Sequence, residues 1–400
     1  MLDSLRNTAP LALVVSSVLV TGCRCNGPSQ DVPSKAQAAA ASGKSTKQMG
    51  IEQARMTNPP TDVALSAASF NPSLEESVEI HYEIAQADRV TVHVYDADGG
   101  LVRTLVDAAE RDAGTHKETW DGRDDDDRLV PDEAYTFTIE TASGGVYDPT
   151  TFSGGAVNDI RDAQFDWDGG TVSYKLPAPA RVLIRLGIHS GPMLKTLVDW
   201  KPRIATTITE YWDGRDEDRL MSLRGREEFS ALITYVTLPD ATVIAYGNDE
   251  QTYRAYKLRR EDGQKKPNRP RQADSELRLR PEGLVPPAWS RAPQVLLTLP
   301  KYDDGDGADN HVPEVYELVD VRVDVHESDK DLLLRDQFEI IFFVDNVFFA
   351  EAERGYLPFN WRWELQQLPP GEHVLTVNVA SFRGQVGVAS RKVDVQRASK

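Results

Sequence analysis

The segment from Arg89 to Asp124 recurs 92 positions further along the chain, from Arg181 to Asp216, with no gap between its landmarks. Each copy carries Arg-Val, then Thr-Leu-Val-Asp, then Trp-Asp-Gly-Arg-Asp in the same register. A fixed register across strand-like segments indicates a duplicated folding unit of about the length of an immunoglobulin domain. The sequence therefore predicts a modular array, although it does not reveal what the array binds.

Alternation of apolar and polar residues is the main secondary-structure signal in the first copy. It runs through residues 78–84 and 90–95 and places Val90, Val92 and Val94 on one face of a strand. Turn-forming residues follow, and the alternation then resumes, as in a β-hairpin. Short strands separated by turns, without a helical period, predict a β-sandwich.

The order of short motifs in the first copy resembles the FlgD-like Ig domain, a module named after the flagellar hook-capping protein. The motifs are Tyr-Asp-Ala-x-Gly, Val-Arg-Thr-Leu, Ala-Gly-x-His and Trp-Asp-Gly-Arg-Asp. The resemblance covers residues 65–145 closely and residues 163–248 more loosely. It implies two Ig-like sandwiches in which the tryptophans lie in the core and the Asp-Gly pairs form turns. These residues are Trp120, Asp121, Gly122, Trp212, Asp213 and Gly214.

A third all-β module is predicted for residues 291–397. Its Phe-Val-Asp-Asn, Trp-Arg-Trp and Gly-Glu-His-Val-Leu-Thr-Val segments resemble the bacterial Ig-like domains of cell-surface proteins. That resemblance implies a presentation or binding module. Trp361 and Trp363 are two residues apart and share a face, so they form either a platform for a ligand or part of the core, and we favour the core.

The first 22 residues have the pattern of a signal peptide, with a short apolar run that ends in Val-Thr-Gly-Cys. This ending resembles the lipobox of bacterial lipoproteins, which implies that Cys23 carries the lipid; an ordinary secretory signal is the alternative. In some bacteria an aspartate directly after the lipidated cysteine resembles a signal for retention in the inner membrane. Arg24 occupies that position here, so we expect the protein at the outer membrane. Residues 23–61 lack large apolar side chains and are expected to form a disordered tether.

The expected architecture is therefore all-β, with three Ig-like β-sandwich modules in tandem behind a signal peptide and a flexible tether. The modules are assigned to residues 62–148, 157–250 and 291–397, and a basic, proline-rich connector to residues 251–290. The formal net charge of −18 argues against nucleic-acid binding, which needs a basic surface. The connector is either a solvated linker or a contact for an acidic partner. Its candidate contact residues are Lys257, Arg259, Arg260, Lys265, Lys266, Arg269 and Arg271.

Metal binding is the one chemical function that the motifs leave open. Residues 303–310 are dense in hard oxygen ligands of the kind that calcium prefers. The candidate ligands are Asp303, Asp304, Asp306, Asp309 and Asn310. The acidic residues after each Trp-Asp-Gly motif are weaker candidates, because acidic surface loops need no metal. No other cofactor is expected.

No catalytic motif is present, so an enzyme is not expected. The sequence favours a non-enzymatic, lipid-anchored protein of the cell envelope whose Ig-like modules act as scaffold, binding or adhesion modules. Its expected partners are the membrane, through the lipid, and other envelope proteins or glycans. One alternative is a structural subunit of a larger envelope or appendage assembly. A carbohydrate-binding or enzyme-accessory protein is a minor alternative.

Overall fold

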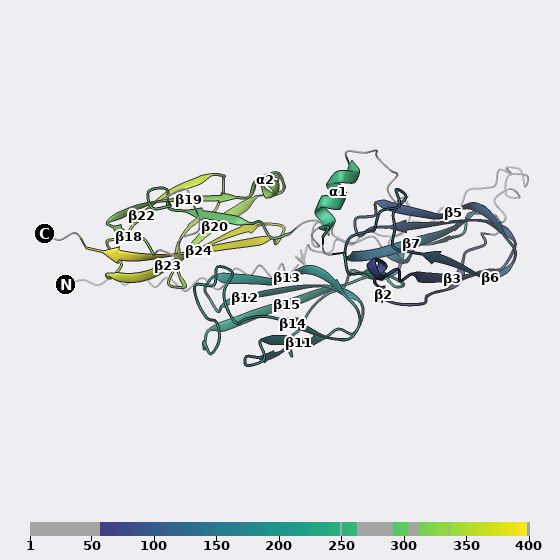
Figure 1. Ribbon diagram of the computed structural model, residues 1–400, viewed down its shortest axis with the longest axis horizontal. Helices are drawn as coiled ribbons and strands as arrows, with labels where there is room; N and C mark the ends of the chain where they lie inside the picture. The colour runs from purple at the N-terminus through teal and green to yellow at the C-terminus, as the bar shows by residue number, and fades with distance from the viewer. Residues whose placement is uncertain (1–56, 249, 262–290, 304–311, 336, 398–400) are drawn as a thin grey trace, which may run out of the picture.

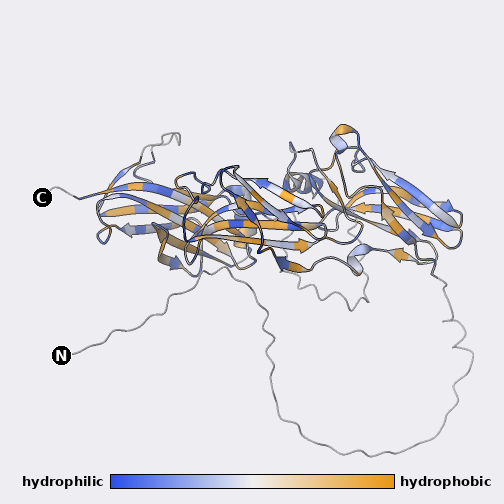
Figure 2. Cartoon of the chain, turned by 90° about the horizontal axis from the view of Figure 1, so that it is seen from below, coloured by the Kyte–Doolittle hydropathy of each residue, from blue (hydrophilic) through white to orange (hydrophobic). Residues whose placement is uncertain are grey.

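A computed structural model describes residues 57–248, 250–261, 291–303, 312–335 and 337–397. These residues form mostly β-strands, in six sheets, with few helices. The prediction of an all-β, Ig-like sandwich fold is confirmed. Along the strands, apolar and polar residues alternate, so one face of each sheet packs on a core (Figure 2). The predicted signal peptide, Cys23 and most of the tether lie outside the described residues.

The sheets occur in pairs around shared cores, and each pair is called a module here. In the first module, β3 (Val78–Ile84) lies between β1 (Thr61–Leu65) and β6 (Gly114–Trp120). The second sheet has the order β2-β16-β7-β4-β5, with β8 beside β7. These strands are β2 (Ser69–Phe70), β4 (Asp88–Tyr95), β5 (Leu101–Arg111), β7 (Glu133–Thr141), β8 (Val146–Tyr147) and β16 (Val243–Ala245), and the 3-10 helices are η1 (Pro72–Leu74) and η2 (Pro149–Thr151).

The second module repeats the pairing of the first. Its sheets have the orders β10-β11-β14 and β13-β12-β15-β9. The strands are β9 (Val157–Asp159), β10 (Gln164–Asp166), β11 (Thr171–Lys175), β12 (Ala180–Ile188), β13 (Met193–Arg203), β14 (Thr207–Tyr211) and β15 (Phe229–Thr237). His81 pairs with Lys117 in the first module, and Ser173 pairs with Thr209 in the second. Both partners are therefore displaced by the same 92 residues as the sequence repeat.

Strand β16 returns the chain from the second module to the first. It follows β15 in sequence, yet it pairs in parallel with β2 and antiparallel with β7. Its Val243 and Ala245 are buried in the core around Trp120. This differs from the sequence-based boundary, which assigned residues 157–250 to the second module. A strand of three residues carries too little alternation to reveal which sheet it joins.

Helix α1 (Tyr253–Glu261) follows β16 and packs on the first module, between it and the third (Figure 1). In the third module, β19 lies between β17 and β22, and the second sheet has the order β18-β24-β23-β20-β21. The elements are β17 (Val295–Thr298), β18 (Glu314–Tyr316), β19 (Leu318–Val325), α2 (Glu327–Leu334), β20 (Phe338–Val344), β21 (Val347–Ala352), β22 (Phe359–Glu364), β23 (Gly371–Ser381) and β24 (Val386–Gln396).

A buried ion pair joins the first and second modules. The guanidinium of Arg181 contacts both carboxylate oxygens of Glu133, at 2.5 and 3.2 Å, and its third contact is the carbonyl of Trp200 at 3.1 Å. Arg181 and Glu133 are 6% and 3% exposed. A bidentate pair with its remaining polar atoms satisfied is the arrangement in which a buried salt bridge is tolerated, and it fixes the orientation of both partners.

Hydrogen bonds join the second and third modules. The Asn378 side chain accepts from the Met193 amide at 2.9 Å and donates to the Met193 carbonyl at 2.8 Å. The Ser390 amide donates to the Asp218 carboxylate at 2.6 Å, and Val374 packs on the core of the second module. The second module therefore contacts both the first and the third module directly, through polar contacts with defined geometry.

Candidate functional site

The site is built on the Trp-Asp-Gly-Arg-Asp loop of the first module. Trp120, at the end of β6, is buried between Phe70 and Tyr135, and its indole nitrogen donates to the Arg123 carbonyl at 3.0 Å. The Asp121 carboxylate accepts the Arg123 amide at 3.0 Å, which closes the turn. Gly122 has a φ of +73°, a conformation that favours glycine. The loop therefore has a fixed shape.

The second module builds the same loop with the same contacts. The Trp212 indole donates to the Arg215 carbonyl at 2.8 Å, and Asp213 accepts the Arg215 amide at 3.0 Å. Gly214 has a φ of +77°. The structure thus places both tryptophans against the cores and both Asp-Gly pairs in turns.

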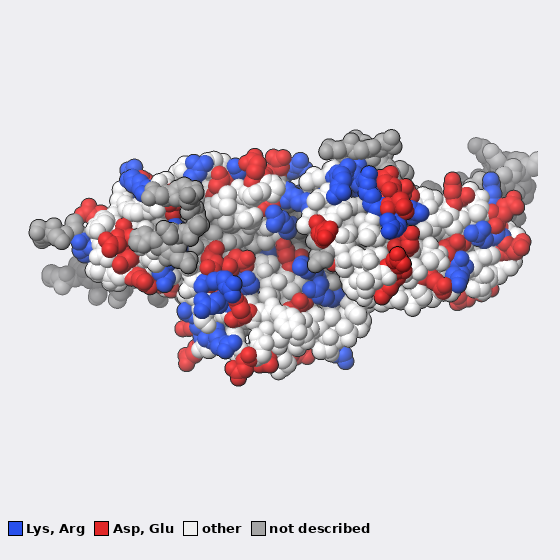
Figure 3. Space-filling view, viewed as in Figure 1, with Lys and Arg blue, Asp and Glu red and all other residues white. Residues whose placement is uncertain are grey.

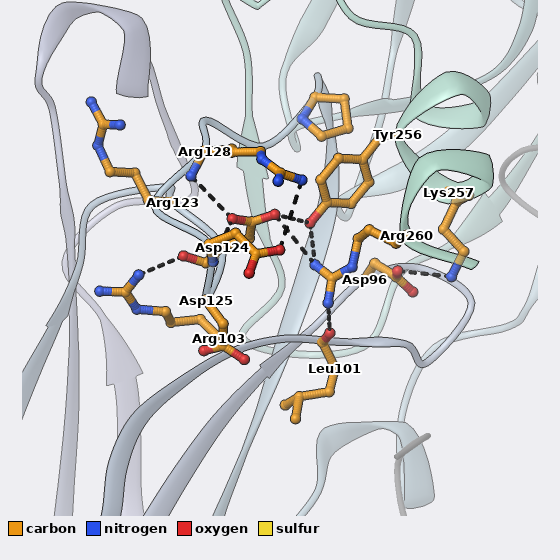
Figure 4. A network of polar contacts seen from close by, with 12 residues as sticks. Asp96, Leu101, Arg103, Arg123, Asp124, Asp125, Arg128, Tyr256, Lys257 and Arg260 are labelled. Atoms are coloured by element: carbon orange, nitrogen blue, oxygen red, sulfur yellow. Dashed lines mark hydrogen bonds and ion pairs between the residues drawn. The ribbon is translucent and has the colours of Figure 1, made fainter. Parts of the chain in front are cut away.

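Helix α1 is seated on the first loop through one of its faces (Figure 4). Asp124 is fully buried; one carboxylate oxygen accepts two amides of its own loop, and the other accepts the Tyr256 hydroxyl at 3.3 Å. The Arg260 guanidinium lies 3.7 Å from the same oxygen and also donates to the Leu101 carbonyl and the Tyr256 hydroxyl. Helix α1 therefore supplies a cation that balances the charge of the Asp124 carboxylate and a hydroxyl that donates a hydrogen bond to it.

Two further contacts join α1 to the turn between β4 and β5 of the first module. The Lys257 ammonium lies 2.9 Å from Asp96, and the Tyr253 hydroxyl donates to Asp98 at 3.1 Å. At the position of α1, basic and acidic side chains lie side by side on the surface (Figure 3). Burial raises the pKa of the Tyr253 and Tyr256 hydroxyls, so both remain donors at neutral pH.

A neighbouring face of α1 reaches the third module. Arg254 lies 2.6 Å from Asp329 of α2, and Arg291 lies 3.2 Å from the same carboxylate. Asp329 is 2% exposed and also accepts the Gln294 amide at 2.9 Å. Helix α1 therefore ties the first module to the third.

Among the described residues, the third module, and not a helix, contacts the equivalent loop of the second module. Asp216, the counterpart of Asp124, accepts the Met221 amide at 2.7 Å, but its second oxygen is buried without a hydrogen-bond partner among the described residues. Desolvation raises the pKa of Asp216. Two residues on, Asp218 keeps part of its surface open to solvent, yet its desolvation beside β24 raises its pKa to about 6.

The predicted contact residues of the connector divide into three groups. Lys257 and Arg260 bind acidic residues of this chain, whereas Arg259 is exposed. Lys265, Lys266, Arg269 and Arg271 lie outside the described residues. Sequence analysis missed the helix itself, because the prolines that favour extended chain begin at Pro267, after the helix has ended. The signal was present: residues 253, 256, 257 and 260 share one helical face.

The predicted calcium ligands are only partly described. Asp303 accepts the Leu299 amide at 2.6 Å and pairs with Arg391, so its carboxylate already has protein partners. Asp304, Asp306, Asp309 and Asn310 lie outside the described residues. Within the described ranges, no group of three or more His, Cys, Asp or Glu side chains is arranged to hold a metal ion.

The cavity between the second and third modules has a volume of about 360 Å³, and most of the charged side chains that line it have partners within their own module. Lys392 lies 3.0 Å from Glu372, and Asp345 lies 2.6 Å from His373. Arg226 also lines the cavity and donates to the Ser222 carbonyl at 2.7 Å. Each of these contacts lies within one module, so together they hold the walls of the cavity in place.

Comparison with known proteins identifies one domain. Residues 72–145 match the FlgD Ig-like domain. The basal-body rod modification protein FlgD of Salmonella typhimurium is 34% identical over 88 residues, which are 22% of this chain and 38% of the relative. FlgD of Escherichia coli matches to the same extent. The chain thus covers well under half of the curated relatives that it matches.

Solved structures give weaker likenesses. An endo-β-1,4-mannanase from Thermotoga petrophila is 19% identical with a TM-score of 0.20, over 46% of this chain and 29% of the other. A likeness of this size carries no argument about function.

Among the described residues, no helix is long and apolar enough to cross a membrane. The family match thus identifies residues 72–145 as a FlgD Ig-like domain, and the described residues around it are mostly β-strands.

Replacement of Arg260 by alanine should loosen α1. The change removes the cation beside Asp124 and two further hydrogen bonds, and a hydrogen bond to a charged group contributes about 1.5–3 kcal/mol. Hydrogen exchange of the α1 amides should therefore accelerate at least ~tenfold. Arg259→Ala, on the exposed side of the same helix, is the matched control and should leave exchange unchanged. Equal exchange rates in the two variants would show that the contacts of Arg260 do not hold the helix on the first module.

The joint at Asp218 should weaken as pH rises. The pKa of Asp218 is about 6 in the folded protein, against 3.8 for an aspartate in the unfolded chain, so the folded protein binds the proton more tightly. Its contribution to stability is complete below about pH 4 and is lost as pH rises through 6. The urea midpoint should fall less between pH 5 and pH 7 in Asp218→Asn than in the unchanged protein or in the exposed control Glu227→Gln. The same fall in all three proteins would contradict this assignment.

Proposed function

We propose that this protein is a non-enzymatic, lipid-anchored scaffold of the bacterial cell envelope whose β-sandwich modules hold binding surfaces in a fixed arrangement. The observation that carries the proposal is the set of direct contacts among the three modules. Glu133 binds Arg181 across the first joint, Asn378 binds Met193 across the second, and α1 binds both Asp124 and Asp329. A chain built only to carry independent domains needs none of these contacts.

The use of the charged groups supports a structural role. Three of the buried carboxylates have partners in the joints: Glu133 binds Arg181, Asp124 binds α1, and Asp329 binds Arg254. A general acid or base needs an open position next to a substrate. The FlgD Ig-like domain at residues 72–145 agrees with a scaffold or binding module.

The anchor comes from the sequence. The apolar run before Cys23 and the Val-Thr-Gly-Cys ending support lipidation, and the polar residues up to position 61 would act as a leash of about 30–35 Å. We place the protein at the outer membrane because Arg24 follows the cysteine. In this arrangement the membrane is the first partner, and other envelope proteins or glycans are the second.

Replacement of Cys23 by alanine tests the anchor. The unchanged protein should incorporate an alkyne-labelled fatty acid and sediment with outer membranes. Cys23→Ala should lose the label and leave the membrane fraction, because one acyl chain or none gives only marginal binding. Cys25→Ala, two residues away, is the matched control and should keep both properties. Retained labelling in Cys23→Ala would contradict the proposed anchor.

Chemical crosslinking in intact cells then tests the scaffold. Solubilised membranes are separated by size, and this protein is detected in each fraction. Reproducible crosslinks to particular envelope proteins or glycans would support the proposal. A protein that forms none and that turns over a small substrate would contradict it.

A further inference from the structure

Strand β21 is an uncovered edge of the larger sheet of the third module. It pairs with β20 on one side and, among the described strands, has no neighbour on the other. Val347, Phe348 and Phe349 are 68%, 50% and 37% exposed. Natural edge strands are usually protected by charged side chains, Pro, β-bulges or short length. Strand β21 has Glu351 and a register shift against β20, but it contains neither Lys nor Pro over its six residues, and its first three residues are apolar. An exposed apolar edge of this kind favours pairing with another strand.

Aromatic rings continue the surface at β21 toward the other sheet. The Phe349 ring lies 5.8 Å from the half-buried ring of Trp361 on β22, and Tyr356 is 56% exposed. Trp361 also contacts Phe342 at 4.5 Å, and Trp363 is fully buried. The two tryptophans thus pack on the core and do not form an exposed platform. A strand added beside β21 would cover the open side of the sandwich.

The second half of the edge is acidic. Glu351 lies on β21, opposite Ile341 of β20, and Glu353 follows directly after the strand. Burial and the charges of Glu351 and Glu353 raise the pKa of Glu339. Among the described residues, none of the three carboxylates has an ion-pair partner within 4.0 Å. A cation brought by a binding partner would relieve their mutual repulsion.

The charge pattern argues against a second copy of this chain as the occupant. Antiparallel pairing of two β21 strands would place the apolar half of each against the acidic half of the other. Parallel pairing would place Glu351 beside Glu351. Like charges directly opposite destabilise a strand pair. A different polypeptide, apolar in one half and basic in the other, fits both halves.

We propose that β21 is a strand-addition site for an extended segment of another protein. The apolar side chains of that segment would cover Val347, Phe348 and Phe349, and its Lys or Arg side chains would meet Glu351 and Glu353. Main-chain hydrogen bonds to the free edge supply affinity, and the two halves of the edge set the register and direction. This site concerns the third module alone, so it can fail without affecting the proposed anchor or scaffold.

The test uses the purified full chain and a labelled synthetic peptide of eight residues. The first half of the peptide alternates lysine with valine, and the second half alternates threonine with valine, as an antiparallel partner requires. Fluorescence polarisation should show saturable binding, and the β21 amides should gain protection from hydrogen exchange. The same peptide with glutamate in place of lysine should bind ~tenfold more weakly, the loss of two exposed ion pairs.

Variants locate the site. Phe348→Lys should abolish binding, because it puts a charge on the apolar half of the edge. Tyr316→Lys changes an exposed aromatic residue on β18, the opposite edge of the same sheet, and should leave binding unchanged. Glu351→Lys should reverse the preference, so that the glutamate peptide binds more tightly than the lysine peptide.

Three outcomes would overturn the proposal. The first is the absence of saturable binding by a chain whose melting temperature shows that it is folded. The second is equal binding to Phe348→Lys and to the unchanged protein. The third is a dimer of the full chain that Phe348→Lys dissociates, because the occupant would then be a second copy.

Discussion

The return of the chain to the first module, at strand β16, determines how the modules are held. The second module begins after β8 of the first module, and β16 leads back from it into the first module's sheet, between β2 and β7. The Asn248 side chain adds a hydrogen bond to the Val130 carbonyl at 2.9 Å. A module attached at both ends has far less rotational freedom than one on a single linker. The buried pair of Arg181 and Glu133 forms within this restraint.

The duplicated loop provides a fixed docking surface in both repeats. In each copy a buried tryptophan and an Asp-Gly turn hold the following carboxylates in place, but the segment that covers the loop differs. Helix α1 reaches Asp124 in the first copy, and the Ser390 amide of β24 reaches Asp218 in the second. Duplication thus supplied two equivalent rigid surfaces, and different later segments of the chain came to pack on them. The Tyr256 hydroxyl donates to Asp124 in the first copy, whereas the second oxygen of Asp216 is buried without a hydrogen-bond partner among the described residues.

The sequence predicted those features that depend on the pattern of neighbouring residues along the chain, namely the strands and the repeat. Val90, Val92 and Val94 are buried as their alternation indicates, and the 92-residue repeat reappears in the strand registers. Strand β16 was not predicted, because its sheet is decided by partners more than one hundred residues earlier. Nor was α1: its cations were interpreted as part of a solvated linker or as a contact for an acidic partner, whereas Lys257 and Arg260 pair with carboxylates of the same chain. Residues far apart in sequence meet at the joints, and no local period marks them.

Pulsed electron spin resonance between the first and third modules tests the central claim, that the modules form one rigid body. The native cysteines are replaced, and spin labels are attached to Thr119→Cys on β6 and Glu364→Cys on β22, both at exposed positions. The account predicts one narrow distance distribution, which broadens when Glu133→Ala and Arg260→Ala remove contacts that hold the modules together. A broad distribution in the otherwise unchanged protein would contradict the account, because it would mean that the modules move independently.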